Sequence, residues 1–264
     1  MTRRLFIFAA YDKDNIVDDS VMFYLRALSG MGDIVFMADN DLSDDELARV
    51  RMVPNVLYAG AMRHGEYDFG SYRRAFGWAK NAEILNNYDW IWFVNDSVYG
   101  PIGDLKGCLA WLESGGAQFV GMVANFDKNT PPHIQSWFMG ICRDLALQDF
   151  VQDFWRSVTK LENKNQICMK YEVGFSELMR AHGIGFKALL VQNSHKCNMV
   201  YRKPYRALRR GLPFIKRSGL KNMFDFDVVA RFVKNQNLLN AIIENANRCG
   251  VVFKKQGWFR RLFV

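Results

Sequence analysis

The sequence lacks the signatures of several common protein classes. It has no run of 18 apolar residues free of charge, so we expect no transmembrane helix. Its five cysteines are widely spaced without a Cys-x-x-Cys pair, which argues against a disulfide framework or a zinc site and favours a reducing cytoplasm. Neither the G-x-G-x-x-G fingerprint nor the G-x-x-x-x-G-K-[ST] loop is present, so the commonest nucleotide-binding loops are excluded.

Acidic residues are almost missing from the last quarter of the chain. Residues 1–195 carry 19 Lys and Arg against 24 Asp and Glu, whereas residues 196–264 carry 16 against 3. A segment this basic favours an anionic partner, either nucleic acid or the anionic face of a membrane. We therefore predict two parts: an α/β domain over residues 1–195 and a basic amphipathic helical extension over residues 196–264.

Short apolar strands alternate with amphipathic helices through the first half of the chain. We expect strands over residues 4–10, 33–38, 55–58, 90–94 and 118–123. Intervening helices are expected over residues 19–28, within 68–86 and over 107–113. This alternation predicts an α/β fold whose mostly parallel sheet is sandwiched by helices. Beyond residue 125 we expect a strand over 133–141, helices over 147–158 and 171–182, and a closing strand over 185–191.

The strongest strand runs directly into a polar turn. Trp90–Val94 is a continuous run of aromatic and β-branched residues, the pattern of a strand buried on both faces. Asn95, Asp96 and Ser97 follow it, and then a Gly-Pro pair. Because ligands of open α/β sheets bind outside the carboxyl ends of the strands, Asp96 is a candidate ligand for a hard divalent cation that holds a diphosphate. The alternative is a solvated turn.

Two further polar clusters lie at the ends of predicted elements. In the first, a loop enters a helix with Gly, Ser and Arg close together, a pattern typical of either a phosphate site or a capped surface helix. Its polar members are Tyr67, Asp68, Gly70, Ser71, Arg73 and Arg74. The second cluster joins residues around position 135 to a carboxylate on a later segment. Its members are His133, Gln135, Ser136 and Glu172.

Five strings together resemble the rhamnan synthesis protein F family, whose members are glycosyltransferases of bacterial surface polysaccharide assembly. In chain order they are YDFGSYRRAF, FVNDSVYGPI, HIQSWFMG, YEVGFSELM and GLPFIKRSGLK, which span roughly residues 67–221. The resemblance implies a GT-A-like nucleotide-sugar domain over residues 1–195, with Mg²⁺ or Mn²⁺ as cofactor. The Asn-Asp-Ser triplet stands where related enzymes carry Asp-x-Asp. Asn95 therefore replaces a first carboxylate, and fewer charged ligands would weaken a bound cation.

Transfer of a sugar from a diphosphate needs neutralisation of the leaving group and, in an inverting reaction, a base for the acceptor hydroxyl. We assign Glu172 as that base, with Asp68 second, and Asp96 with His195 as metal ligands. The expected acceptor contacts are His133, Gln135 and Ser136. The expected donor contacts are Ala10, Tyr11, Tyr67, Gly70, Ser71, Arg73, Arg74, Asn95 and Ser97.

The expected partners follow from this assignment and from the basic extension. They are a nucleotide sugar of rhamnose, galactofuranose or a similar sugar, a lipid-linked glycan of O-antigen or rhamnan type, the inner face of the cytoplasmic membrane, and other polysaccharide-assembly glycosyltransferases. Large apolar residues interleave with the basic ones, and the terminal WFRRLFV is the expected inserting segment. Two alternatives stay open: a non-catalytic nucleotide-sugar-binding scaffold, favoured by Asn95, and a nucleic-acid-binding protein, which the absence of any recognised motif disfavours.

Overall fold

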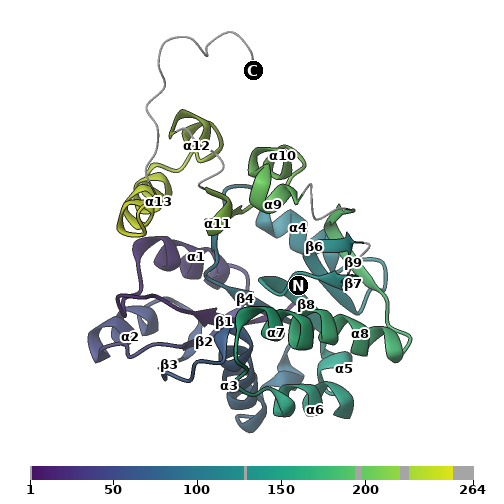
Figure 1. The fold of residues 1–264 in the computed structure, drawn as a ribbon. Helices are drawn as coiled ribbons and strands as arrows, with labels where there is room; N and C mark the ends of the chain where they lie inside the picture. Colours follow the sequence, from purple (N-terminus) through teal and green to yellow (C-terminus); the bar gives the residue numbers. More distant parts are fainter. Residues whose placement is uncertain (1, 128–129, 194–197, 221–225, 252–264) are drawn as a thin grey trace.

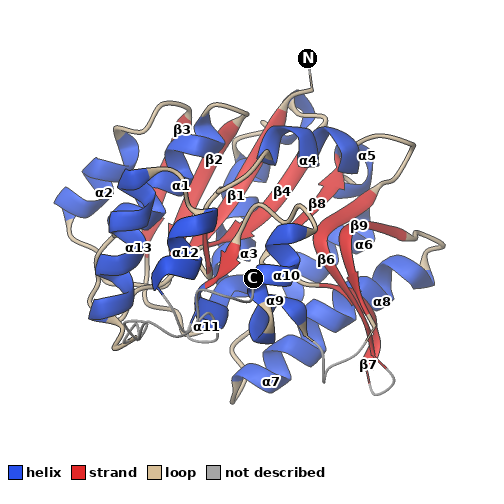
Figure 2. Ribbon diagram, turned by 90° about the horizontal axis from the view of Figure 1, so that it is seen from above, coloured by secondary structure: helices blue, strands red, loops and turns tan. Residues whose placement is uncertain are grey.

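The chain folds around one central sheet (Figures 1 and 2). The computed structural model describes residues 2–127, 130–193, 198–220 and 226–251. In the described chain the strand order is β3-β2-β1-β4-β8-β6-β7, and β9 pairs with the opposite edge of β6. The parallel strands are β1 Arg4–Ala10, β2 Asp33–Ala38, β3 Val56–Ala61, β4 Trp90–Asn95, β6 Phe119–Asp127 and β9 Phe186–Gln192, and the antiparallel ones are β7 Thr130–Ile134 and β8 Phe138–Cys142.

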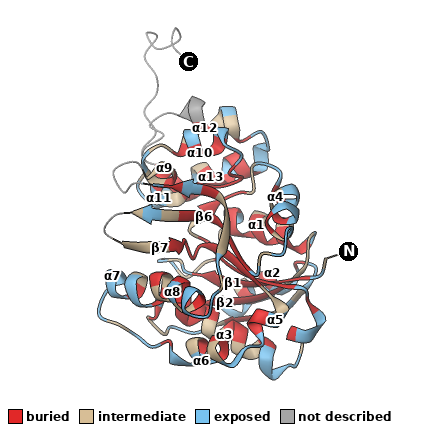
Figure 3. Cartoon of the chain, turned by 90° about the vertical axis from the view of Figure 1, so that its right-hand side faces the viewer, coloured by how far each residue is buried: buried red, intermediate tan, exposed pale blue. Residues whose placement is uncertain are grey.

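Successive side chains of the central strands enter two separate cores. Phe6, Phe8 and Trp92 pack on one face, whereas Ile7 and Phe93 pack on the other, as the alternation of a strand requires. Figure 3 shows that much of the central sheet is buried. Helices cover both faces, which confirms the predicted α/β sandwich. The first face is covered by α1 Asp19–Ser29, α2 Asp44–Arg51 and α4 Leu105–Leu112, and the second by α3 Tyr67–Asn81, α5 Arg143–Ala146, α6 Asp149–Ser157 and α8 Gly174–Ala181.

Two predicted elements differ from the observed ones. The strand expected over residues 133–141 is divided into β7 and β8 by a turn, in which Gln135 N–H donates to the Val123 carbonyl at 2.8 Å. The helix expected from Tyr171 begins earlier, with α7 Lys164–Ile167, and continues through a π-helical turn, Cys168–Val173, into α8. The sequence indicated that Glu172 lies at the start of a helix. In the structure it lies inside one.

The first part of the basic extension packs into the main core. Its buried apolar side chains include Val200, Leu212 and Phe214, which join the face covered by α1 and α4. A short antiparallel ribbon pairs β5 with β10, at Val98–Lys216 and Tyr99–Ile215. The elements of this part are β5 Val98–Tyr99, α9 Met199–Arg202, α10 Pro204–Arg209, β10 Ile215–Lys216 and α11 Arg217–Leu220.

The rest of the described extension is helical and lies against α1. It consists of α12 Phe226–Phe232 and α13 Gln236–Arg248, and Tyr99 Oη donates to Asn245 Oδ1 at 2.5 Å. The terminal WFRRLFV lies outside the described residues. No helix in the described ranges combines the length and apolar character that a bilayer span requires.

We predict that the fold depends on the packed part of the extension. Phe214 is 1% exposed and its ring lies 5.2 to 5.9 Å from those of Tyr24, Trp137 and Phe138. Phe214→Ala should lower the free energy of unfolding by about 3–5 kcal/mol in urea denaturation, because it leaves a cavity in the main core. Phe126→Ala, at a ring that is 41% exposed, is the control and should cost less than half as much. Equal losses would contradict the expectation.

Candidate functional site

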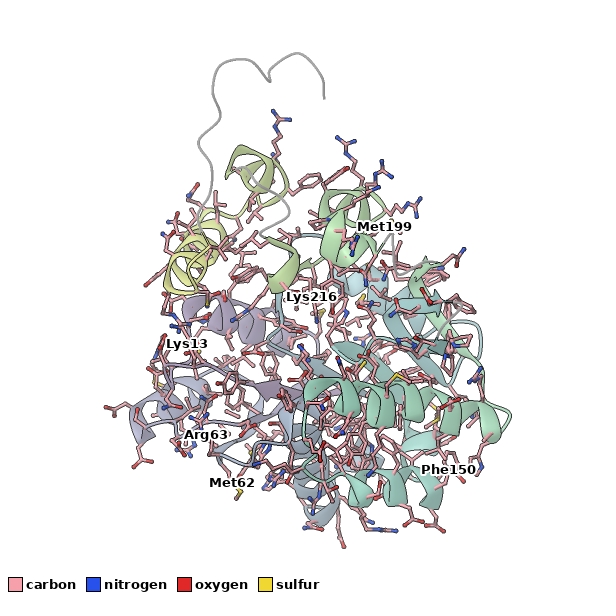
Figure 4. All side chains as sticks on the ribbon, in the orientation of Figure 1. Lys13, Met62, Arg63, Phe150, Met199 and Lys216 are labelled. Atoms are coloured by element: carbon pink, nitrogen blue, oxygen red, sulfur yellow. The ribbon has the colours of Figure 1, made fainter. Side chains whose placement is uncertain are left out.

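A cavity of about 720 Å³ opens where β1 and β4 end, the edge at which the sequence predicts a ligand site. Figure 4 marks Arg63 and Lys216, which belong to its lining. The cavity brings together half of the predicted site residues, with members from all three polar clusters. These residues are Tyr11, Tyr67, Asp68, Asn95, Asp96, Ser97, Ser136 and Glu172.

Asp96 is a buried carboxylate at the end of β4. Its main chain is tied to β1, since Asp96 N–H donates to the Ala9 carbonyl at 3.2 Å and Tyr11 N–H donates to Asp96 Oδ2 at 3.1 Å. Burial raises the pKa of Asp96 to about 7, although the nearby Arg217 favours its charged form. A carboxylate held at such a cost is typical of a functional site, where a ligand compensates for the lost hydration.

Asn95 organises its neighbours through both atoms of its amide. The Nδ2 group donates to Asp68 Oδ2 at 2.6 Å, and Oδ1 accepts from the Ser97 N–H at 3.1 Å and from the Ser97 hydroxyl. An aspartate at position 95 could not donate to Asp68 and would place two like charges side by side. Asparagine at this position thus has a geometric reason: it orients Asp68, whose pKa is raised by burial.

Lys216 and Arg217 bring two cations into the cavity from the basic extension. Lys216 Nζ donates to Ser97 Oγ at 2.6 Å and lies 5.2 Å from the centre of the Trp137 ring. Burial lowers the pKa of Lys216 to about 8, against the attraction of Asp68. Arg217 N–H donates to the Ser97 carbonyl at 2.9 Å, which fixes the ribbon beside the Asn-Asp-Ser turn.

Sequence reasoning missed these two cations. Lys216 and Arg217 lie in GLPFIKRSGLK, the last string of the family resemblance, but the charge pattern grouped them with the membrane-binding extension. The pairing of β10 with β5 joins segments more than 100 residues apart, and local sequence patterns do not predict such a contact. Lys164 of α7, also unpredicted, lines the same cavity.

Glu172 is held by the turn between β7 and β8. Its Oε2 accepts from both the main-chain N–H and the hydroxyl of Ser136, at 2.7 and 2.6 Å. Its Oε1 accepts from the Cys168 thiol at 3.3 Å, and burial raises the pKa of this thiol to about 12, which keeps it a donor. His133 Nε2 lies 3.8 Å from Oε1. The π-helical turn places Cys168 and Glu172 on the same side of the helix, and such turns are frequent at functional sites.

Four predicted donor contacts of the cluster around α3 do not line the cavity. Arg74 Nη1 donates to Glu66 Oε2 at 2.8 Å, and Arg73 Nη1 donates to the Val158 carbonyl at 3.0 Å, so both guanidinium groups are used within the fold. Ser71 Oγ lies 3.0 Å from His64 Nε2. A side chain at Gly70 would meet the Glu66 and His64 side chains, which explains the glycine by packing.

Three other predicted residues also lie away from the lining. His133 is 3% exposed and its Nδ1 lies 2.8 Å from the Pro131 carbonyl. Gln135 donates to Asn125 Oδ1 at 3.0 Å and accepts from the Trp137 indole at 2.6 Å, so it braces the turn. Ala10 lies beneath Asp96 in a small neighbouring hollow.

The predicted metal site is only partly described. His195 lies outside the described residues, and within the described ranges no group of three or more His, Cys, Asp or Glu side chains is arranged to hold a metal ion. Two carboxylates of the cavity lining, Asp96 and Asp68, are hard oxygen ligands close to the Asn-Asp-Ser turn. Mg²⁺ typically binds one or two carboxylates together with substrate phosphates, so this donor set fits such a cation.

The fold and the cavity define an α/β protein with a charged cavity at the carboxyl edge of a mostly parallel sheet. The family model of rhamnan synthesis protein F matches residues 34–249. The chain belongs to this family, which confirms the resemblance found in its motifs. No curated protein matches the sequence significantly.

Three solved structures cover nearly the whole chain at 11% identity. A protein described as a nucleotide-diphospho-sugar transferase of Desulfovibrio desulfuricans G20 has a TM-score of 0.46, over 94% of this chain and 96% of that one. A cytidylyltransferase of Leptospira borgpetersenii has 0.44 over 98% and 100%. Residues 1–349 of S. aureus TarS have 0.38 over 96% and 93%. Because these TM-scores lie below 0.5, we draw no conclusion from them.

We predict a stability gain on neutralising Asp96. Its pKa is raised in the folded chain from the usual 3.8 to about 7, so the folded protein loses stability as pH rises across that window. Asp96→Asn should remove this loss. The difference in unfolding free energy between variant and wild type should grow by about 2 kcal/mol from pH 5 to pH 8 in urea denaturation.

The matched control for this measurement is Asp144→Asn, a carboxylate on α5 whose side chain is 72% exposed. The expectation fails if the difference in unfolding free energy between Asp96→Asn and wild type is independent of pH, or changes no more than for the control. Either result would show that the pKa of Asp96 is not raised in the folded protein.

Proposed function

We propose that this protein is a nucleotide-sugar-dependent glycosyltransferase that extends a lipid-linked bacterial surface polysaccharide. The donor sugar is rhamnose, galactofuranose or a similar sugar, and the product is a glycan of O-antigen or rhamnan type. Family membership supports this proposal. The observation that carries it is the cavity in which Asp68, Asp96 and Glu172 meet Lys216 and Arg217.

The paired cations suit the departure of a nucleoside diphosphate. As the bond between the anomeric carbon and the diphosphate oxygen breaks, negative charge develops on the leaving group. Lys216, Arg217 and Lys164 line the cavity in which that group would lie, and cations in a water-poor site stabilise such charge strongly. A divalent cation bound by Asp96 and Asp68 would add Lewis-acid stabilisation of the same leaving group.

Glu172 suits the role of general base in an inverting reaction. Its carboxylate would accept the proton of the acceptor hydroxyl while the acceptor oxygen forms its bond to the anomeric carbon. Ser136 donates to one of the two carboxylate oxygens and orients the group, and the other oxygen has the weaker thiol of Cys168 as its donor. That second oxygen is the one we assign to proton transfer.

A non-catalytic nucleotide-sugar-binding scaffold is the second candidate. Its support is Asn95, which leaves one carboxylate fewer for a metal. Lys216 and Arg217 offset this loss, because they provide positive charge without requiring a second acidic ligand. The acceptor on the cytoplasmic face of the membrane, and association with other polysaccharide-assembly glycosyltransferases, belong to the leading proposal. Nucleic acid is not proposed as a partner.

Thermal-shift screening tests donor binding. The full chain is heated with UDP-, dTDP- and GDP-sugars, with and without Mn²⁺. We expect the sugars of one nucleotide class to raise the melting temperature. Lys216→Met should weaken binding of that donor by on the order of 10-fold or more, as expected for loss of a buried charge-assisted contact. Lys106→Met, at an exposed position on α4, is the control. The absence of any shift with all donors would defeat the proposal.

We predict that Glu172→Gln separates catalysis from binding. The amide cannot accept the acceptor proton, so kcat should fall by about 10²- to 10⁴-fold while the donor shifts the melting temperature as in wild type. Glu177→Gln, an exposed position one turn further along α8, is the matched control. A collapse of donor binding in Glu172→Gln would show instead that the carboxylate is a donor contact. Normal turnover in Glu172→Gln would remove the base from the mechanism.

A further inference from the structure

A second hollow, the α4–α10 groove, lies outside the catalytic cavity. It has a volume of about 530 Å³ and runs between α4, β9 and α10, which lie side by side in Figure 1. Its lining is mainly apolar. The apolar side chains are Ile102, Trp111, Leu189, Leu208, Leu212 and Phe232. Asp104 also lines the groove, where its carboxylate accepts from the Gly107 N–H at 2.8 Å and caps α4.

Four exposed arginines, which we call the arginine rim, lie on α9 and α10 or directly after α10, close in the sequence to two residues of the α4–α10 groove. Arg202 and Arg206 precede the groove residue Leu208, and Arg209 and Arg210 lie between Leu208 and the groove residue Gly211. In Figure 4, side chains with nitrogen tips project outward from this part of the molecule, near Met199. The sequence contains no Asp or Glu from residue 178 to residue 224. In the described chain no carboxylate pairs with these four arginines.

Several surface arginines elsewhere on the protein pair with a neighbouring carboxylate, unlike the four of the arginine rim. Arg143 Nη2 lies 3.0 Å from Asp144 Oδ1, and Arg180 Nη2 lies 3.6 Å from Glu177 Oε1. Unpaired guanidinium groups on one face attract anions, and several of them together bind a surface of phosphates better than a single ion. The charge of this rim therefore needs an extended anionic partner.

The opposite rim has the residue type that prefers a membrane interface. Trp111 is 49% exposed on α4, and Lys187 Nζ of β9 lies 4.1 Å above its ring. Tryptophan is enriched where apolar and aqueous phases meet. The Lys187 ammonium donates to the Trp111 and Ser114 carbonyls and so holds this ring at the surface. The arginines suit the phosphate region of an anionic bilayer. The apolar groove and Trp111 suit the acyl-chain region beneath it.

We propose that the α4–α10 groove docks the protein on an anionic phospholipid membrane. The arginine rim contacts lipid phosphates, and Trp111 enters the level of the upper acyl chains. This surface belongs to described, folded residues, so it is separate from the predicted insertion of the terminal WFRRLFV. Tyr201 of α9 lines the catalytic cavity three residues before α10 begins. Docking would thus set the cavity beside the membrane, a consequence that rests on the proposed function.

Vesicle flotation of the full-length chain tests the proposal. The protein is mixed, without any donor sugar, with vesicles of phosphatidylglycerol and phosphatidylcholine or of phosphatidylcholine alone. Wild type should float with the anionic vesicles at low salt and lose binding as salt increases. The variant Arg206→Gln/Arg209→Gln/Arg210→Gln should lose on the order of 10²-fold in partition coefficient, about fivefold for each arginine.

The charge-matched control is Arg143→Gln/Arg156→Gln/Arg180→Gln, which removes three arginines that are paired with carboxylates on α5, α6 and α8. This control should float as wild type does. Equal binding by both triple variants would overturn the docking surface, because binding would then come from net charge or from another segment. Preference for single-stranded RNA over anionic vesicles would also overturn it, in favour of a nucleic-acid surface.

Insertion of Trp111 has its own measurement. In a Trp258→Phe background, which removes the tryptophan of the terminal WFRRLFV, vesicles with brominated acyl chains should quench part of the tryptophan fluorescence, and Trp111→Phe should remove most of that quenching. Quenching that is equal with and without Trp111→Phe in this background would show that the groove does not reach the acyl chains, and would overturn this part of the proposal. These binding measurements need no catalysis, so their failure is distinct from failure of the glycosyltransferase proposal.

Discussion

The burial of opposite charges at one edge of the sheet is the constraint on which the site depends. Asp68 and Asp96 lose hydration behind β4, and Lys216 and Arg217 lose it beside them. Each group is costly to bury alone, and for Asp68, Asp96 and Lys216 the attraction between opposite charges offsets only part of that cost. The pKa of Asp96 still rises to about 7 and that of Lys216 still falls to about 8. The folded protein therefore holds a cavity whose charges are incompletely compensated, and a ligand that compensated them would stabilise the fold.

Because of this constraint, part of the basic extension packs against the α/β domain and contributes to its core. The β5–β10 ribbon delivers Lys216 to Ser97, and Phe214 anchors that ribbon in the main core. The same part of the extension also carries exposed arginines on α9 and α10 and apolar residues of the α4–α10 groove. One stretch of sequence thus contributes to the cavity with its buried residues and, in our proposal, to membrane docking with its exposed ones. The two roles use different side chains and can be separated by mutation.

Asn95 illustrates how an apparent loss of function can have a structural reason. Judged by sequence alone, it removes a metal ligand. In the folded chain its amide links Asp68 to Ser97, and Ser97 in turn accepts from Lys216. The arrangement exchanges one negative charge for a hydrogen-bonded chain that ends in a positive one. Metal use and cationic stabilisation are therefore complementary in the proposed reaction, and the Mn²⁺ comparison in the donor screen measures their balance.

Local patterns in the sequence determined the α/β class, the buried strand Trp90–Val94 and the polar edge that follows it. These features repeat with the period of a strand or helix, or end at recognisable turns. Each can therefore be predicted from its own stretch of sequence, without knowledge of the segments that pack against it. Only the tertiary structure decided which charges meet. It turned Arg74 toward Glu66, placed Glu172 in a π-helical turn against Ser136, and brought Lys216 to Ser97 from 119 residues away. Such choices depend on long-range packing and on the cost of burying charge, which no local periodicity records.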